Sequence, residues 1–173
     1  MTAPPGTAVR RPLLSFPDPV NEVAARLVAA GVVIMAVVAV AFDARWLTVV
    51  MAYGFIARVA TGPRLSPLGL VVTRVVVPRL PVEPRFVPGP PKRFAQGIGA
   101  VVTTTAAVLA FVGDAWPAAR VLLVLISVAA FLEAALAFCV ACKVFALLMR
   151  VGVIPESACE QCSDLRTGGR AAA

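Results

Sequence analysis

The four cysteines of this 173-residue sequence form two Cys-x-x-Cys pairs with sixteen residues between them. Cys139 and Cys142 lie at the end of a long apolar segment, whereas Cys159 and Cys162 lie in a polar tail. The spacing within each pair is typical of a dithiol that exchanges with other thiols. The spacing of all four also fits a zinc ion with four cysteine ligands. A third interpretation makes them small packing residues without a chemical role.

The residues beside the cysteines bear on these interpretations. Lys143 next to Cys142 would favour its thiolate, whereas Glu160 next to Cys159 would disfavour a thiolate there. For zinc, an extended return from a turn over 152–155 is long enough to bring the tail back to the first pair. We take redox chemistry as the leading hypothesis, with all four cysteines as redox residues. Zinc held by the same four cysteines is the alternative.

The composition indicates a membrane protein. Hydrophobic residues make up 60% of the sequence, above the roughly 45–50% of soluble domains, and they fall in long blocks. The lipid bilayer is therefore an expected partner. The net charge of +7 does not indicate nucleic acid binding, because the basic residues flank apolar spans and form no face interleaved with aromatic residues. The sequence has no histidine, which excludes histidine-based catalysis and histidine metal ligands.

Four apolar segments predict four transmembrane helices, over about 27–42, 46–60, 94–113 and 121–142. Short turns after the first and third segments would fold them into two helical hairpins. The expected fold is therefore an all-α membrane protein with a four-helix transmembrane domain over 23–150.

The remaining segments are polar or irregular. We expect an irregular cytoplasmic N-terminus over 1–22, with no secretory signal peptide, and a polar cytoplasmic tail over 151–173. The loop over 61–93 is basic and rich in proline. Its apolar stretch 68–80 is interrupted by an arginine and a proline, which favours an interfacial helix lying on the membrane over a fifth span.

The two halves of the sequence resemble one another. A shift of 71 residues places Pro17 on Pro88 and Asp43 on Asp114. Each half would then be a proline-rich segment followed by a helical hairpin. Both hairpins would begin on the same side of the membrane, which makes the candidate internal repeat parallel rather than inverted.

Lysine and arginine set the expected orientation in the membrane. With four spans, fourteen of the sixteen basic residues fall on the side that holds both termini and the central loop, and only Arg45 and Arg120 fall on the other. We therefore expect a multi-pass protein of the bacterial inner (plasma) membrane with both termini in the cytoplasm. Both cysteine pairs would then face the cytosol, where stable structural disulfides are uncommon.

Two charged residues lie inside the predicted spans. Arg58 and Glu133 each follow the start of a span by twelve residues, so we predict an intramembrane ion pair between them near mid-bilayer. Such a pair would either fix helix register or take part in moving a proton or substrate. In one continuous helix, Cys139 would lie about 120° around from Glu133 and Cys142 nearly opposite. Glu133 is therefore not expected to act as a base for Cys142.

Three segments resemble a known family: "GPRLSPLG" (62–69), "GPPKRFAQGIG" (89–99) and "AFCVACKVFALL" (137–148). They look like bacterial integral membrane proteins catalogued as domain of unknown function 4395, over roughly residues 17–162. The resemblance implies a small multi-span membrane protein in which Arg93, of the RFAQ element, would anchor the third span. It brings no established activity, so no catalytic residue is carried over. Members look like neighbours of thioredoxin-like or sulfurtransferase proteins, which are the protein partners that the resemblance implies.

These observations lead to one leading hypothesis and two alternatives. The leading hypothesis is a membrane partner in thiol/disulfide or sulfur redox chemistry at the cytoplasmic face. The first alternative is a non-enzymatic membrane scaffold whose four cysteines clamp zinc. A transporter ranks third, because the sequence shows no discontinuous helix at which a substrate would bind.

Overall fold

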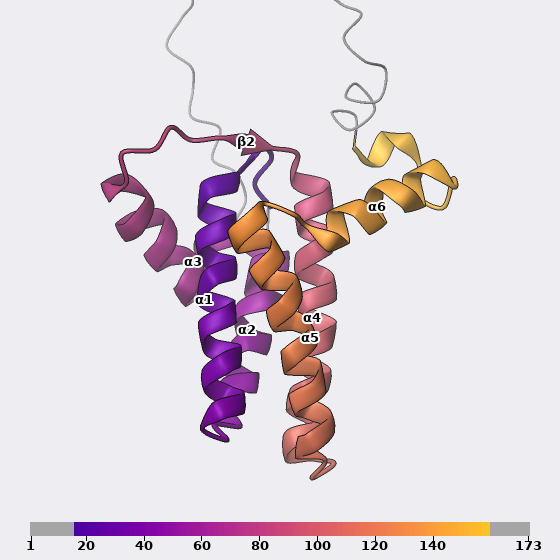
Figure 1. Cartoon of the computed structure of the whole chain (residues 1–173). Coiled ribbons are helices and arrows are strands. Elements are labelled where there is room, and N and C mark those ends of the chain that lie inside the picture. The colour runs from indigo at the N-terminus through magenta and orange to yellow at the C-terminus, as the bar shows by residue number, and fades with distance from the viewer. Residues whose placement is uncertain (1–15, 160–173) are drawn as a thin grey trace, which may run out of the picture.

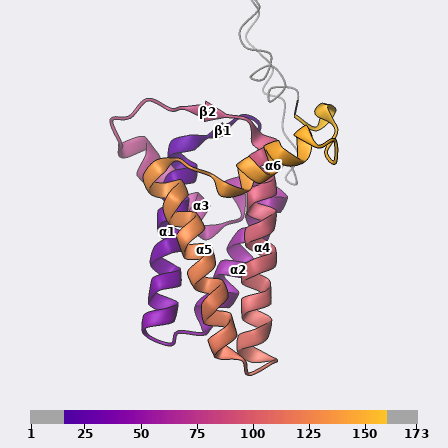
Figure 2. The ribbon, with the colours of Figure 1, turned by 45° about the vertical axis from the view of Figure 1, so that its right-hand side comes forward.

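The computed structural model describes residues 16–159, and within them nearly all regular structure is helical (Figure 1). Four helices stand side by side as a bundle, a short fifth packs against two of them, and a sixth projects sideways from one end (Figures 1 and 2). The upright helices are α1 (Glu22–Ala41), α2 (Trp46–Thr61), α4 (Gly89–Phe111) and α5 (Trp116–Leu136), and the others are α3 (Pro67–Val71) and α6 (Val140–Arg150). The expected all-helical fold is confirmed.

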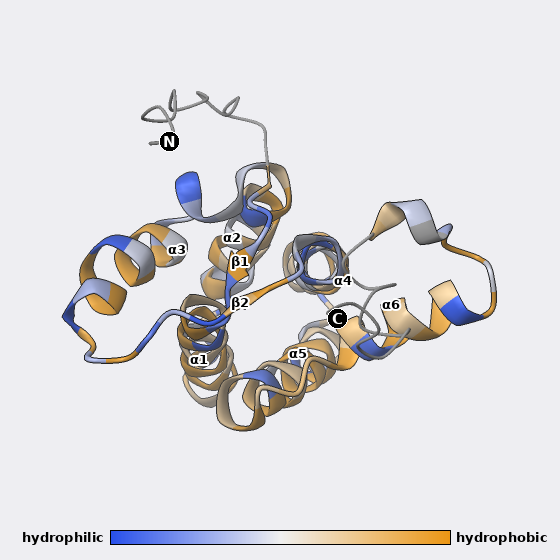
Figure 3. Cartoon of the chain, turned by 90° about the horizontal axis from the view of Figure 1, so that it is seen from above, coloured by the Kyte–Doolittle hydropathy of each residue, from blue (hydrophilic) through white to orange (hydrophobic). Residues whose placement is uncertain are grey.

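Three helices, α1, α4 and α5, are long and apolar enough to cross a membrane. At most a third of the most apolar window of each helix is buried inside the structure, and the ribbons of α1 and α5 are coloured mainly hydrophobic when viewed from above (Figure 3). Outward-facing apolar surface of this kind is stable in lipid. Helix α2 has 16 residues and rises about 24 Å, less than the roughly 30 Å of a bilayer core.

The closest packing in the bundle joins helices that are not consecutive in the sequence. Turns over 42–45 and 112–115 make α1 antiparallel to α2 and α4 antiparallel to α5, yet the most extensive contacts join α1 to α5 and α2 to α4. Small residues allow these helices to approach closely. Gly99 of α4 is the clearest case, because a Cβ atom there would collide with the ring of Phe55 on α2.

The two turns form the lower end of the bundle, as oriented in Figure 1. Asp43 and Asp114 both have positive φ angles, of 52° and 43°, which aspartate tolerates better than most residues. Arg45 pairs with Asp114 at 3.2 Å, and Arg120 pairs with Asp43 at 3.3 Å. Trp116, buried between the turns, donates its indole N–H to Asp43. Each turn is thereby tied to the other by charge.

The upper end contains the starts of α1 and α4. Strand β1 (Val20–Asn21) pairs antiparallel with β2 (Phe86–Val87) and ties the starts of these two helices together. The Asn21 side chain caps α1 by accepting the N–H groups of Val23 and Ala24, which satisfies backbone donors at the helix start. Asp18 likewise accepts the N–H of Gly89 at 3.0 Å. Both ends of the described chain lie at this end of the bundle (Figure 1).

The chain after α2 turns partway along the bundle, below its upper end. Helix α3 continues through a π-helical turn over Val72–Val76 into a 3₁₀ turn over Val77–Arg79, giving one helical run over 67–79. Leu68, near its start, packs on Gly31, which lies nine residues, or about 14 Å, down α1 from Glu22. From there the run rises outward to the upper end (Figure 1). The stretch 68–80 therefore lies along the side of the bundle rather than across its end, and its placement on or through the membrane stays a prediction.

The helix predicted over 121–142 is divided. Helix α5 ends at Leu136, Ala137 has a left-handed φ of 54°, and α6 begins at Val140 and projects sideways from the upper end (Figure 1). The Arg26 guanidinium donates to the carbonyls of Ala134 and Ala135 at 3.0 and 3.1 Å, which satisfies the free acceptors at the end of α5. The prediction of one continuous helix was therefore wrong. The break could not be read from the sequence, because no glycine or proline marks it.

Candidate dithiol site and adjoining cavity

The first cysteine pair lies at the N-terminus of α6. Cys139 is the N-cap residue and is disulfide-bonded to Cys142, with 5.2 Å between their Cα atoms. The Cys142 backbone N–H donates to the Cys139 sulfur at 3.3 Å. When the disulfide is reduced, the positive end of the helix dipole and this N–H favour a negatively charged sulfur at Cys139. The pair therefore has an arrangement suited to a reactive dithiol.

The second cysteine pair is only partly described. Cys159 is 4% exposed and packs in an apolar cluster with Phe145 and Met149 of α6; Phe94 of α4 packs against the same cluster, with its ring centroid 5.5 Å from that of Phe145. Cys162 lies outside the described residues. None of the described cysteines is a free thiol.

The zinc interpretation stays a prediction. Two of its four proposed ligands, Cys139 and Cys142, are bonded to each other in the structure. Within residues 16–159, no group of three or more histidine, cysteine or acidic side chains lies close enough together to hold a metal ion. A four-cysteine clamp would therefore require reduction of this disulfide and a rearrangement of the tail.

The intramembrane acid, Glu133, pairs with a different cation from the one predicted. Its carboxylate forms a short ion pair with Lys92 of α4 rather than with Arg58. Glu133 lies three residues before the end of α5, and Lys92 lies three residues after the start of α4. Both therefore sit near the upper end instead of at mid-bilayer. The depth prediction counted from 121, whereas α5 starts at Trp116.

Arg58, near the end of α2, is 6% exposed and is held by neutral partners. Its Nε donates to Gln96 Oε1 at 2.8 Å, its Nη1 donates to Ser66 Oγ at 3.0 Å, and its guanidinium lies 4.4 Å from the Phe55 ring centroid. Its Nη2 forms no hydrogen bond within the described residues. No buried side-chain nitrogen or oxygen among them is left without a partner, so Nη2 is not fully enclosed by protein.

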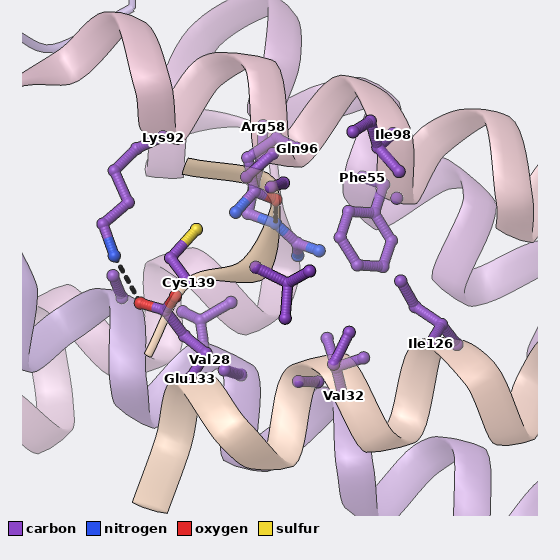
Figure 4. A pocket seen from close by; sticks show the side chains of 18 residues that line it. Val28, Val32, Phe55, Arg58, Lys92, Gln96, Ile98, Ile126, Glu133 and Cys139 are labelled. Carbon is purple, nitrogen blue, oxygen red and sulfur yellow. Dashed lines mark hydrogen bonds and ion pairs between the residues drawn. The ribbon is translucent and has the colours of Figure 1, made fainter. Parts of the chain in front are cut away.

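Arg58 lines two adjoining cavities, and the inner one is drawn in Figure 4. The inner cavity, of about 110 Å³, lies between α1, α2, α4 and α5 and has Cys139 and Glu133 in its wall. The outer cavity, of about 260 Å³, extends toward residues 16–21 at the upper end. Both are lined by Arg58, Lys92 and Gln96. The disulfide therefore borders a small apolar cavity that contains a few polar groups, which is the usual character of a ligand site.

The break after α5 also changes the relation between Glu133 and the disulfide. One continuous helix would place them on different faces. In the structure the chain turns sharply at Ala137, and the side chains of Cys139 and Glu133 line the same inner cavity (Figure 4). Cys142 is not among the lining residues. Of the two sulfurs, that of Cys139 is thus the one presented to a ligand in this cavity.

Sequence reasoning missed three polar residues at this site, Ser66, Lys92 and Gln96. Lys92 and Gln96 are four residues apart on α4, so they share one face of that helix, and this spacing could have paired them with the two charges. Ser66 precedes Pro67 and caps α3 by accepting the N–H of Gly69, a recognisable helix-start pattern. Its contact with Arg58 follows from the turn of the chain after α2, which has no comparable signal.

Comparison with known proteins identifies one family. The family model for a domain of unknown function, DUF4395, matches residues 20–150. No curated protein and no solved structure matches the chain. The matched range contains all three segments on which the resemblance rested. The first segment supplies Ser66, which bonds Arg58. The other two supply Lys92, Gln96 and Cys139, which line the cavities. Segments far apart in the sequence therefore meet at one place.

Proposed function

The chain belongs to the DUF4395 family, and we propose that this member is an integral membrane protein that exchanges disulfide bonds with thiols at its upper end. Cys139 and Cys142 are the exchanging pair. The observation that carries the proposal is the position of their disulfide, at the N-terminus of α6 with Cys139 in the wall of a cavity. A structural disulfide needs neither the helix dipole nor access for a thiol.

The exchange step follows from this position. A thiolate attacks the Cys139 sulfur, the bond to Cys142 breaks, and its electron pair leaves with the Cys142 sulfur as a thiolate. A second thiolate then attacks the sulfur of the bound thiol and releases Cys139 as a thiolate, which the helix N-terminus stabilises. Two thiols are thereby oxidised to one disulfide, and the protein disulfide is reduced to two thiols.

We also propose four membrane crossings. Helix α2 and the run over 67–79 together would make one broken crossing, because α2 rises from the lower end and the run continues to the upper end. In the turn between them Gly62 and Ser66 are buried, and Gly62 and Pro63 line the outer cavity; irregular backbone at membrane depth is tolerated where it is buried in protein or lines a cavity. Such a discontinuous crossing is the feature that the sequence did not reveal.

Both hairpins would then belong to a parallel repeat. The lower turns support this, since each carries an aspartate with positive φ, Asp43 or Asp114, at the equivalent position. The packing supports it as well, because exchanging the two halves converts the contact of α1 with α5 into the contact of α4 with α2.

The orientation proposed is that of the bacterial inner membrane with the upper end in the cytoplasm. Fourteen of the sixteen basic residues belong to that end under four crossings. Disulfides in the cytosol are mostly transient and catalytic, which agrees with an exchanging pair. A thioredoxin-like or sulfurtransferase protein is the proposed protein partner, and Cys159 with Cys162 would pass electrons between it and the membrane pair.

The order of attack on the two cysteines tests the proposal. The full chain carrying Cys142→Ser should form a stable mixed disulfide at Cys139 when treated with an aromatic disulfide such as 5,5′-dithiobis(2-nitrobenzoate). The chain carrying Cys139→Ser should react several-fold more slowly at Cys142, because that sulfur does not line the cavity. Equal rates at the two positions, or no reaction at either, would refute the exchange mechanism.

A further inference from the structure

We infer that the inner and outer cavities bind a small anionic thiol as the substrate of the Cys139–Cys142 disulfide. The inference rests on the proposed exchange function and adds to it the charge and size of the substrate. It is carried by Arg58, a buried cation that has no acidic partner among residues 16–159 and that lines the inner cavity together with Cys139.

The charge in the cavities is unbalanced. Lys92 and Glu133 neutralise each other in their ion pair. Arg58 has only the neutral oxygens of Gln96 and Ser66 as partners and forms no ion pair with a carboxylate among residues 16–159. A buried cation without a counter-charge is costly. An anion in the cavity would supply the missing counter-charge.

The geometry of Arg58 leaves one donor for this anion. Gln96, Ser66 and the Phe55 ring hold the guanidinium, and Nη2 is the nitrogen that has no hydrogen bond among the described residues and is not fully enclosed. Lys92, in the first turn of α4, lines the same cavities, but Glu133 neutralises its charge. Guanidinium groups bind carboxylates and other oxyanions strongly through such charge-assisted hydrogen bonds.

The volumes limit the ligand to a small molecule. At about 110 and 260 Å³, each cavity falls below the roughly 300–1,000 Å³ of sites for drug-sized ligands. The remaining lining is apolar, from Val28, Val32, Phe55 and Ile126 among others. A short aliphatic thiol with one carboxylate has the matching character, with its anionic group on Arg58, its carbon chain on the apolar wall and its sulfur toward Cys139.

The reaction is the exchange already described, with the substrate now specified. The sulfur of the bound thiolate forms a bond with Cys139 Sγ, and Cys142 leaves with the electron pair of the broken bond. A second molecule of the same thiol attacks the substrate sulfur and releases a symmetrical dianionic disulfide. The protein gains two electrons and each thiol gives up one, so the reaction balances without a further reactant.

Three small thiols of different charge test the inference on the full chain in detergent: 3-mercaptopropionate, 2-mercaptoethanol and cysteamine. Cleavage after Arg120 and Lys143 isolates Cys139 and Cys142 on one peptide, so alkylation and mass spectrometry measure their reduction separately from the tail pair. An oxidised synthetic peptide of residues 138–143 provides the reference rate for each thiol, which corrects for intrinsic nucleophilicity.

Relative to this reference, we expect 3-mercaptopropionate to react at least about tenfold faster than 2-mercaptoethanol, and cysteamine to be slowest, since one charge-assisted hydrogen bond corresponds to about this factor. Arg58→Gln should remove most of the preference. Arg93→Gln is the matched control, because Arg93 is an exposed cation on the same helix as Lys92, bonded to the Val59 carbonyl and absent from both cavities. It should retain the preference.

A measurement on the unmutated chain covers the case in which Arg58→Gln does not fold. Propionate, which has the carboxylate and no thiol, should slow reduction by 2-mercaptoethanol several-fold by occupying the site. No preference for 3-mercaptopropionate together with no effect of propionate would overturn the anion site and leave the exchange function standing. Failure of all three thiols to reduce the pair faster than the reference peptide would refute the exchange function itself.

Discussion

The two ends of the bundle handle charge in opposite ways. At the lower end, Arg45 and Arg120 each pair with an aspartate of the opposite turn, on side chains that are largely exposed. Toward the upper end, Arg58 and Lys92 are buried and the Glu133 side chain is 13% exposed, and Arg58 has no acidic partner among residues 16–159. The paired surface charges at the lower end connect the two turns. A buried charge without a partner, close to a disulfide, is instead typical of a candidate functional site.

Backbone regularity follows the same division. The lower end joins its helices through two short turns of similar form, each with one aspartate at positive φ. Toward the upper end lie the turn after Thr61, the sharp turn at Ala137 and the start of α6 at the disulfide. Breaks in helices leave space and free polar groups, and both cavities lie where these breaks occur.

The largest effect is expected from breaking the buried ion pair. Glu133→Gln or Lys92→Met should each destabilise the protein by about 3 kcal/mol, because each leaves one charge buried without its partner. The double variant Lys92→Met/Glu133→Leu should recover much of this loss. Unfolding by denaturant in detergent micelles measures all three. A double variant no more stable than either single variant would show that the pair is not coupled.

Packing between α2 and α4 gives the next prediction. Gly99→Ala should destabilise the protein by roughly 1–3 kcal/mol, because its new methyl group would collide with the Phe55 ring that lies beside Arg58. Gly97→Ala, two residues away on the same helix, has no atom within 4 Å of its added Cβ. It should be neutral or stabilising, since alanine favours helix. Equal thermal stability of the two variants would contradict the packing.

The sharp turn at Ala137, before the disulfide, can be tested by a smaller change in stability. Ala137→Gly should stabilise the protein by about 1 kcal/mol, because glycine adopts the left-handed conformation at Ala137 without steric cost. Ala135→Gly, inside α5, should instead cost roughly 0.5–1 kcal/mol. Thermal unfolding of the two variants in the same detergent makes the comparison, and a destabilised Ala137→Gly would argue for a continuous helix there.

The smallest effect is expected at the lower end. Asp114→Asn should cost no more than about 1 kcal/mol, because its partner Arg45 is 42% exposed and the Asp114 side chain is 92% exposed. The effect should also fade in high salt. A loss as large as that for Glu133→Gln would remove the contrast between the two ends.

The sequence was sufficient where hydropathy and turn signals coincide. Long apolar segments predicted α1, α4 and α5, and the positions of Asp43 and Asp114 predicted the two lower turns. It was insufficient where tertiary contacts override local pattern. Nothing at Ala137 resembles a helix stop, and its conformation is supported by hydrogen bonds from Arg26, more than a hundred residues earlier in the sequence.

The error in pairing Glu133 has a similar origin. Counting residues from the start of each apolar segment assumes straight, full-length helices. Because α5 begins before 121 and α4 begins at Gly89, Lys92 reaches Glu133 from the upper end. Arg58 remains deeper, where Ser66 meets it after the turn that follows α2. Long-range partners of this kind follow from the path of the chain rather than from spacing.

The most direct test of the exchanging dithiol is a redox titration of the full chain, purified anaerobically in detergent, with zinc measured on the same sample. We expect Cys139 and Cys142 to convert together between dithiol and disulfide as one two-electron couple in dithiothreitol buffers, with far less than one zinc per chain. About one zinc per chain, with thiols that react only after chelation, would contradict the account and establish the structural clamp. A pair that stays in one redox state throughout the titration would contradict it equally.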